Sequence, residues 1–196
     1  MIELHRLEGD TLSSALMEIA QLRIEVFREW PYLYQGDLDY ERRYLQPYVA
    51  SEQAIVIGVY DGDRLVGAST GTPMVDHSDD FAAGFAKTDY ALEQIFYCAE
   101  SILLPPYRGK GIGHRFFEAR EAHAKQLGFS YSAFCAVERG KDHPARPSFY
   151  RPLDAFWRSR GYAPLPAVIA HFAWKDIGDR VETEKPMQFW IKSIQT

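Results

Sequence analysis

The stretch IFYCAESILLPPYRGKGIGHRFFEAREAHAKQLG, residues 95–128, decides the fold. Residues 95–104 have the length and apolar composition of a buried strand, and the prolines at 105 and 106 end it because proline cannot donate to a ladder. A glycine-rich turn, RGKGIG at 108–113, leads into a helical segment that Gly128 would end. Glycines let a backbone approach a phosphate closely, and the first N–H groups of a helix have no partner within it. The order strand, turn and helix therefore predicts an anion site, to which Arg108 and Lys110 add positive charge.

Two phosphate-binding patterns do not fit this turn. A P-loop needs Ser or Thr after its Gly-Lys pair, whereas Gly111 follows Lys110. A dinucleotide fingerprint needs a third small residue, which would fall on Phe116. The segment 103–113 instead resembles the signature of the GNAT superfamily of acyl-CoA N-acyltransferases: an aliphatic strand end, a proline, then Arg/Gln-x-x-Gly-x-Gly/Ala.

The resemblance implies an α/β (α+β) fold with a mixed sheet of six or seven strands and helices on both faces. Its central parallel strands, 95–104 and 130–137, would splay apart, and a single N-acetyltransferase domain would span 1–196. In the family, amides of the turn hold the pyrophosphate of coenzyme A and the strand end pairs with the pantetheine arm. The residues expected to bind acetyl-CoA are Ile102, Leu103, Leu104, Arg108, Gly109, Lys110, Gly111, Ile112, Gly113 and His114.

Composition limits the other possibilities. A net charge of −5 argues against nucleic acid or an anionic membrane as the main partner, since either needs a basic face. No apolar run approaches a membrane span, and the N-terminus lacks the pattern of a signal peptide. Cys98 and Cys135 are not spaced as a metal or redox pair, and no H-E-x-x-H motif is present, so no metal site is expected. We expect a cytoplasmic protein with reduced cysteines.

The resemblance also implies a carboxylate that deprotonates the attacking amine. Glu100 is the only acid in the central strand, but strict alternation places it on the face opposite Tyr97, where family bases more often lie. Only a β-bulge in this strand would turn Glu100 to the same face as Tyr97. Glu138, at the end of the next predicted strand, is the rival base, and Tyr97 is a further catalytic candidate.

The coenzyme A thiolate must be protonated as it leaves, and the sequence lacks the usual proton donor. Trp157 stands where many family members have a tyrosine that protonates the thiolate, and indole cannot supply a proton at neutral pH. Trp157 is therefore expected to pack, with Leu153 and Phe156, beside the pantetheine channel. Tyr150 and Tyr97 are the phenols expected nearest the site.

The sequence says less about the residues that would bind the acceptor amine. Tyr32 and Tyr34 lie in an aromatic loop that flanks the acceptor pocket in the family, or they pack beneath that loop. The acidic segment 75–94 is either a short helix over the site or a surface excursion. Four acids are compatible with a cationic acceptor such as a polyamine or aminoglycoside, but all of them are also ordinary cap and loop residues: Asp37, Asp39, Asp79 and Asp80.

Two functions follow. The first is an N-acetyltransferase that moves an acetyl group from acetyl-CoA to a primary amine by direct attack in a ternary complex. Its acceptor would be a small-molecule amine, a protein N-terminus or a lysine, and the enzyme would be a monomer or homodimer. The second is a non-catalytic acyl-CoA sensor or interaction domain on the same fold.

Overall fold

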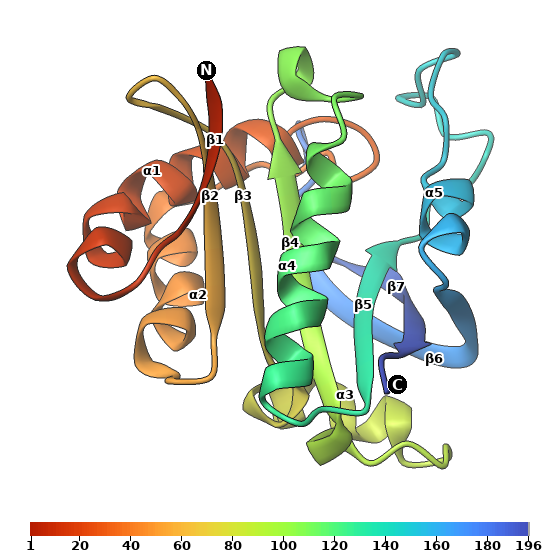
Figure 1. The fold of residues 1–196 in the computed structure, drawn as a ribbon. Helices are drawn as coiled ribbons and strands as arrows, with labels where there is room; N and C mark the ends of the chain where they lie inside the picture. Colours follow the sequence, from red (N-terminus) through yellow and green to blue (C-terminus); the bar gives the residue numbers. More distant parts are fainter. Residues whose placement is uncertain (196) are drawn as a thin grey trace.

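Seven strands form one mixed sheet in the order β1-β2-β3-β4-β5-β7-β6 (Figure 1). The computed structural model describes residues 1–195, without the side chains of Ser78 and Ala167. Neighbouring strands are antiparallel except β4 and β5, which are parallel. This arrangement confirms the predicted fold. The strands are β1 (Ile2–Arg6), β2 (Ile55–Asp61), β3 (Arg64–Pro73), β4 (Ile95–Leu103), β5 (Tyr131–Val137), β6 (Ala163–Trp174) and β7 (Thr183–Ser193).

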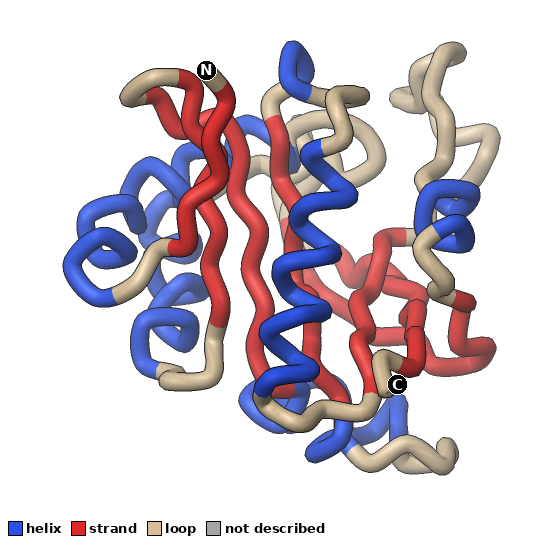
Figure 2. Tube along the Cα trace, viewed as in Figure 1, coloured by secondary structure: helices blue, strands red, loops and turns tan. Residues whose placement is uncertain are grey.

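Helices cover both faces of the sheet, as the red strands and blue helices of Figure 2 show. Helix α4 crosses in front of β4 in Figure 1 and connects it to β5, while α1 and α2 pack against β3 on the other side. Asp37 begins α2 because its carboxylate accepts from the Tyr40 N–H at 2.7 Å. The helices are α1 (Gly9–Phe27), α2 (Leu38–Ala50), α3 (Ser78–Phe85), α4 (Ile112–Gln126) and α5 (Asp154–Ser159).

Strands β4 and β5 separate soon after they begin. Their pairing covers only residues 95–97 of β4 and 131–133 of β5. Beyond this point β4 remains paired with β3 as far as Leu103, and β5 remains paired with β7 as far as Val137. A parallel pair that separates in this way leaves main-chain groups of both strands facing an opening, as the family resemblance implied.

Helix α3 settles one of the alternatives for residues 75–94. Phe81 and Phe85 are buried, and both rings meet Phe189 of β7 edge-on at 5.0 Å between centroids. The segment is therefore a packed part of the core rather than a surface excursion. It lies at the lower end of the view in Figure 1, by the start of β4 and away from the glycine turn.

The apolar residues form two clusters on the one sheet. The larger joins α1, α2 and α4 to strands β2 to β4, and the smaller joins α3 to β5, β6 and β7. None of the helices in residues 1–195 is apolar over a length that could cross a bilayer.

Candidate active site

The glycine turn has the backbone shape that the sequence predicts. Gly109 and Gly111 have φ values of 74° and 79°, in the region that favours glycine, and Gly111 is the N-cap of α4. A Cβ atom added at either glycine would meet no atom within 4 Å. The turn therefore presents bare backbone to open space.

The main-chain donors of this turn are free. Within the described chain, the N–H groups of residues 109–113 donate to no main-chain or side-chain acceptor. The last two belong to the first turn of α4, where no partner exists within a helix, and the helix dipole adds partial positive charge. Five consecutive free donors at a helix N-terminus are suited to a phosphate or pyrophosphate group.

The charged side chains of the turn have unequal roles. Arg108 donates from Nε to the Leu103 carbonyl at 2.9 Å and from Nη1 to Glu29 at 2.7 Å, so it braces the turn against the end of α1. Lys110 lies over the ring of Tyr107, 5.3 Å from its centroid. His114 is exposed, with its ring against Phe156 at 4.9 Å.

Three of the four aliphatic residues predicted to bind coenzyme A have buried side chains. Ile102, Leu104 and Ile112 are buried in the larger core cluster. Leu104 N–H donates to Val66 O at 3.0 Å, and because antiparallel ladders alternate, the N–H groups of residues 101 and 103 point away from β3 into the opening.

A β-bulge decides where Glu100 lies. Thr70 of β3 pairs with Glu100 and Thr72 pairs with Tyr97, so two residues of β4 oppose the single residue Gly71. The extra residue reverses the alternation and turns Glu100 toward α1 and α2, on the side of Tyr97. The expectation that Glu100 and Tyr97 lie on opposite faces was therefore wrong. Ser101 turns the other way, and its hydroxyl accepts from Arg120 of α4 at 2.9 Å.

Glu100 belongs to a buried ionic cluster. Its Oε2 lies 2.8 Å from Arg23 Nη1 and accepts the hydroxyl of Tyr44 at 3.0 Å. Arg23 Nε also donates to Glu41 Oε2, and its guanidinium lies over the Tyr44 ring, 4.0 Å from the centroid. Arg23, Glu41 and Glu100 are 6%, 0% and 7% exposed. One cation is thus shared by two carboxylates in the interior.

The electrostatics of the cluster follow from this sharing. Burial acts to lower the pKa of Arg23, but the carboxylates of Glu100 and Glu41 outweigh it and hold that pKa above its ordinary value. Burial and the nearby Glu100 raise the pKa of Tyr44 well above its ordinary value. Tyr44 therefore keeps its proton and donates it to Glu100 in a hydrogen bond.

Sequence reasoning missed four residues of this region: Arg23, Glu41, Tyr44 and His77. Arg23 stands on the apolar face of α1, and a charge at a core position was the available signal. His77 is half-buried, with its ring 5.1 Å from that of Tyr97 and its Nε2 without a hydrogen-bond partner among the described residues. Burial lowers the pKa of His77, so its imidazole is mostly neutral near pH 7.

The other predicted residues have varied surroundings. Tyr97 OH lies 3.2 Å from Cys135 Sγ across the base of the opening. Tyr32 packs between Phe27 and Trp174, and burial raises its pKa. Tyr34 is half-buried, and burial together with the Glu41 carboxylate raises its pKa.

Glu138, the rival base, is exposed, and no contact of its side chain with the ionic cluster is present in the described chain.

Trp157 packs, as expected, but with different neighbours. Its ring lies 5.0 Å from that of Phe134 and 5.1 Å from that of Trp190. Leu153 precedes α5 as its N-cap and is 53% exposed, so its expected place in this packing was wrong. Tyr150 meets Trp30 edge-on at 5.9 Å.

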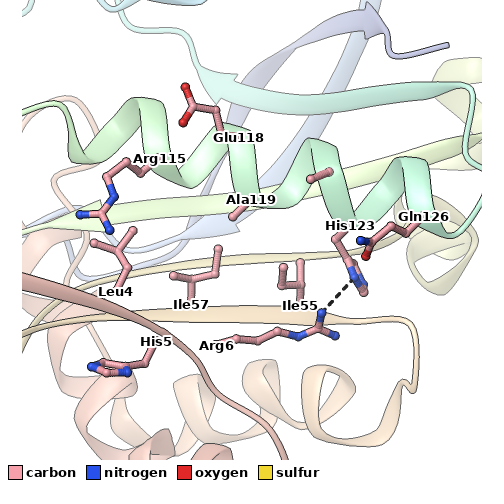
Figure 3. Close-up of a pocket in the computed structure, with 11 residues that line it drawn as sticks. Leu4, His5, Arg6, Ile55, Ile57, Arg115, Glu118, Ala119, His123 and Gln126 are labelled. Carbon is pink, nitrogen blue, oxygen red and sulfur yellow. Dashed lines mark hydrogen bonds between the residues drawn. The ribbon is translucent and has the colours of Figure 1, made fainter. Parts of the chain in front are cut away.

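A separate hollow of about 510 Å³ lies between the β1–β2 edge and α4 (Figure 3). Leu4, Ile55 and Ile57 form its apolar floor, and Arg6 reaches across it to His123. None of the predicted site residues lines it. In the described part of the chain, no three His, Cys, Asp or Glu side chains gather as a metal ion would require.

Comparisons with known proteins agree with this geometry. The model of the acetyltransferase (GNAT) family matches residues 19–154. The YncA protein of Salmonella typhimurium, solved with its cofactor acetyl-CoA, superposes with a TM-score of 0.59 at 10% identity, over 99% of this chain and 95% of that one. An N-acetyltransferase from Staphylococcus aureus gives 0.60 at 9% identity, over 98% and 99%.

A ribosomal-protein-alanine N-acetyltransferase from Brucella melitensis superposes with a TM-score of 0.60 at 11% identity, over 96% of this chain and 99% of that one. No curated protein sequence matches the chain significantly. The structural likenesses, at such low identity, concern the fold alone, whereas the family match spans most of the sequence. The chain belongs to the GNAT family of acetyltransferases.

Proposed function

We propose that this acetyltransferase moves an acetyl group from acetyl-CoA to a primary amine, by direct attack in a ternary complex at the β4–β5 opening. The observation that carries the proposal is the arrangement along β4. A row of free N–H donors follows the strand, unpaired main chain lies along its open edge, and the buried carboxylate of Glu100 stands beside that edge.

The residues present fit coenzyme A. The N–H groups of 109–113 would hold the pyrophosphate, where the absence of Cβ atoms at Gly109 and Gly111 leaves room for it. Lys110 and His114 lie beside this cradle. The open-side main chain of residues 101 and 103 would hydrogen-bond the pantetheine arm. When bound, acetyl-CoA supplies an acetyl group already activated as a thioester.

The chain must then make the amine neutral and polarise the thioester carbonyl. Glu100 is the proposed base, because Tyr44 and Arg23 occupy its Oε2 while its Oε1 has no hydrogen-bond partner in the described chain. Open-side N–H groups of β4 are the proposed donors to the carbonyl oxygen. The C–N bond forms as the C–S bond breaks. Of the three protons of the substrate ammonium group, one passes to Glu100, one leaves with the thiolate sulfur as coenzyme A thiol, and one stays on the amide nitrogen.

Protonation of the thiolate needs no strong acid. A thiol has a pKa of about 8.5, so the thiolate is a tolerable leaving group near neutral pH. Burial raises the pKa of Tyr97 well above its ordinary value, which keeps a protonated phenol beside the opening. Trp157 serves packing in this mechanism.

The proposal extends to the setting of the protein. The acceptor is a small-molecule amine, a protein N-terminus or a lysine, with no nucleic acid or membrane involved, and the enzyme acts as a monomer or homodimer. The free thiols of Cys98 and Cys135 suit the cytoplasm. The rival function is an acyl-CoA sensor without chemistry, which the same free donors would support.

A thiol-release assay separates the two functions. Wild-type protein is incubated with acetyl-CoA and a panel of primary amines, and free coenzyme A is followed by absorbance while mass spectrometry identifies the acetylated amine. An enzyme forms thiol and acetylated amine in equal amounts. A sensor binds acetyl-CoA in calorimetry and forms neither product above the rate without protein.

A further inference from the structure

Arg120 of α4 is a buried cation that no carboxylate balances. The residue is 1% exposed, yet within residues 1–195 its guanidinium pairs with no Asp or Glu side chain. Arg23, the other buried arginine in this part of the chain, faces two carboxylates. A buried charge is costly unless other groups compensate it, so the partners of Arg120 indicate what it does.

The guanidinium of Arg120 binds the main chain at the β-bulge instead. Nη1 donates to the Glu100 carbonyl at 2.8 Å and to the Thr70 carbonyl at 3.3 Å, and Nη2 donates to the Ser101 hydroxyl at 2.9 Å. Thr70 and Glu100 form the regular pair that borders the bulge. Arg120 therefore joins β3 and β4 at the place where the bulge disrupts their ladder.

The bond to the Glu100 carbonyl also affects the opposite edge of β4. The Glu100 carbonyl and the Ser101 N–H belong to one peptide group, here called the bulge peptide, and its two polar ends point in opposite directions. The carbonyl end faces Arg120 and β3, and the N–H end faces the β4–β5 opening. A charged donor at the carbonyl end polarises the peptide and makes its N–H a stronger donor, above all in a low dielectric.

The helix that begins at the glycine turn also carries Arg120. Ile112, Phe116 and Arg120 are spaced four residues apart and are all buried on the side of α4 that packs on the sheet. Figure 1 shows this helix crossing over β4. The Arg120 guanidinium also lies over the Phe117 ring, 4.8 Å from its centroid, which favours one position of the side chain. A single helix thus connects the proposed coenzyme turn to the charge behind the bulge peptide.

We propose that Arg120 is a positioning residue for acetyl transfer, which acts through the bulge peptide on the thioester carbonyl. This inference rests on the proposed function, in which open-side N–H groups of β4 donate to that carbonyl. Arg120 fixes the Ser101 N–H in the opening and increases its partial positive charge, without touching acetyl-CoA. The carbonyl oxygen gains negative charge as the amine attacks and loses it again as the C–S bond breaks. The N–H bond is therefore strongest in the transition state, and Arg120 raises kcat more than it tightens acetyl-CoA binding.

The stretching frequency of the thioester carbonyl measures this polarisation directly. Difference infrared spectra of acetyl-CoA, isotopically labelled at the carbonyl carbon and bound without any amine, report this one group. Bound to the wild-type protein, the band should lie below that of free acetyl-CoA, because a donor to the oxygen weakens the C=O bond. In Arg120→Met the band should return toward the free position. In Arg120→Lys, which keeps the charge but loses the fork of donors, it should lie between the two.

Arg160→Met is the matched control for the loss of a guanidinium. The Arg160 side chain is 14% exposed, lies over the same Phe117 ring at 5.9 Å, and pairs with Glu118 and Glu121 of α4. Within the described chain it donates to no strand. Both Met variants should therefore lose stability, whereas only Arg120→Met should move the carbonyl band. A wild-type band at the free position, or an Arg120 variant with its band at the wild-type position, would overturn the proposal.

Rates of acetyl transfer at saturating acetyl-CoA complete the test. Arg120→Met should lower kcat by about 10- to 10³-fold, up to the loss of one oxyanion donor, and Arg120→Lys by less. The Kd of acetyl-CoA, from calorimetry, should change by less than about threefold. Equal losses of kcat in Arg120→Met and Arg160→Met, corrected for the folded fraction, would show a structural role and overturn the proposal. If Arg120→Met does not fold, Arg120→Lys decides both measurements by the same criteria.

Failure of the proposed function gives a different pattern. If acetyl-CoA binds with a carbonyl band that depends on Arg120 but no amine is acetylated, the function is rejected and the polarising role of Arg120 is retained. If amines are acetylated while the band does not depend on Arg120, that role is rejected and the acetyltransferase function is retained. A folded protein that binds no acetyl-CoA rejects both.

Discussion

The two oxygens of Glu100 have different surroundings, and this asymmetry supports the proposed role of the residue as the base. Oε2 accepts from Tyr44 and lies against Arg23, which fixes the carboxylate, while Oε1 keeps a free lone pair. A buried ion pair of this kind adds little net stability, since desolvation offsets attraction. Its main effect in this structure is to fix the position of Oε1.

Replacing Glu100 by Gln should lower kcat by about 10²–10⁴-fold, because a general base is worth that much and an amide cannot take a proton. Trp157→Phe should keep kcat within about tenfold, since no acid is lost. Rates at saturating acetyl-CoA, with circular dichroism confirming the fold, test both. A collapse of activity in Trp157→Phe with coenzyme binding intact would require a chemical role for the indole.

His123 should make stability depend on pH. Its Nε2–H donates to the Gln53 carbonyl at 2.9 Å, and its Nδ1 accepts from Arg6 at 3.4 Å, so the folded chain holds the neutral ring. Burial lowers the pKa of His123, and Arg6 lowers it further against the opposing Gln53 bond. Stability is therefore complete above the unfolded pKa of about 6.5 and is lost as pH falls from there toward the lower folded pKa.

Urea unfolding at about pH 7.5 and pH 5.5 measures this loss, which is at most about 1.4 kcal/mol per pH unit for one group. His123→Gln should reduce the loss, although His77, whose pKa burial also lowers, keeps part of it. His5→Gln, at an exposed position of β1, is the control and should leave the slope as it is. An unchanged slope in His123→Gln would show that its imidazole is protonated freely in the fold.

At the scale of elements, the glycine turn could be predicted because its cause is local. Positive φ values, free helix N–H groups and flanking cations all follow from residues 108–113 themselves. The orientation of Glu100 could not, because the bulge depends on register with β3 and on Arg120 of α4, which donates to the Thr70 and Glu100 carbonyls. Its partners Arg23 and Tyr44 likewise come from helices distant in sequence, α1 and α2, and no local pattern connects them.

Gly111→Ala should weaken coenzyme A binding by about tenfold or more, because the added Cβ enters the space that the pyrophosphate needs and φ at this position is positive. Gly128→Ala is a matched control. Its φ is 86°, its Cβ would also meet nothing within 4 Å, and it lies at the other end of α4. Calorimetry should show unchanged affinity in the control. Equal weakening in both variants would mean that strain, and not access to the turn, sets the affinity.

At the scale of the molecule, both apolar clusters pack on one sheet, and β4, β5 and β7 connect them. The seven-stranded mixed sheet and the parallel central pair confirm the predicted architecture, because strand–turn–helix patterns specify a right-handed crossover. The ionic cluster and the packing of α3 in the core were not predicted, since both depend on contacts between segments far apart in the chain.

A single domain over 1–196 remains a prediction, and unfolding tests it. Heat or urea should give one transition by tryptophan fluorescence and by circular dichroism, because neither cluster has a sheet of its own. Coenzyme A at about 100 times its Kd should raise the free energy of unfolding by about 2.7 kcal/mol. Two separated transitions would indicate halves that fold independently.

The initial velocity of acetyl transfer, measured while acetyl-CoA and the best primary amine of the thiol-release panel are both varied, tests the central claim most directly. Direct attack in a ternary complex predicts intersecting double-reciprocal lines, equal amounts of thiol and acetylated amine, and no acetylated protein by intact mass. Parallel lines with an acetylated protein, or thiol release that does not depend on the amine, would contradict it.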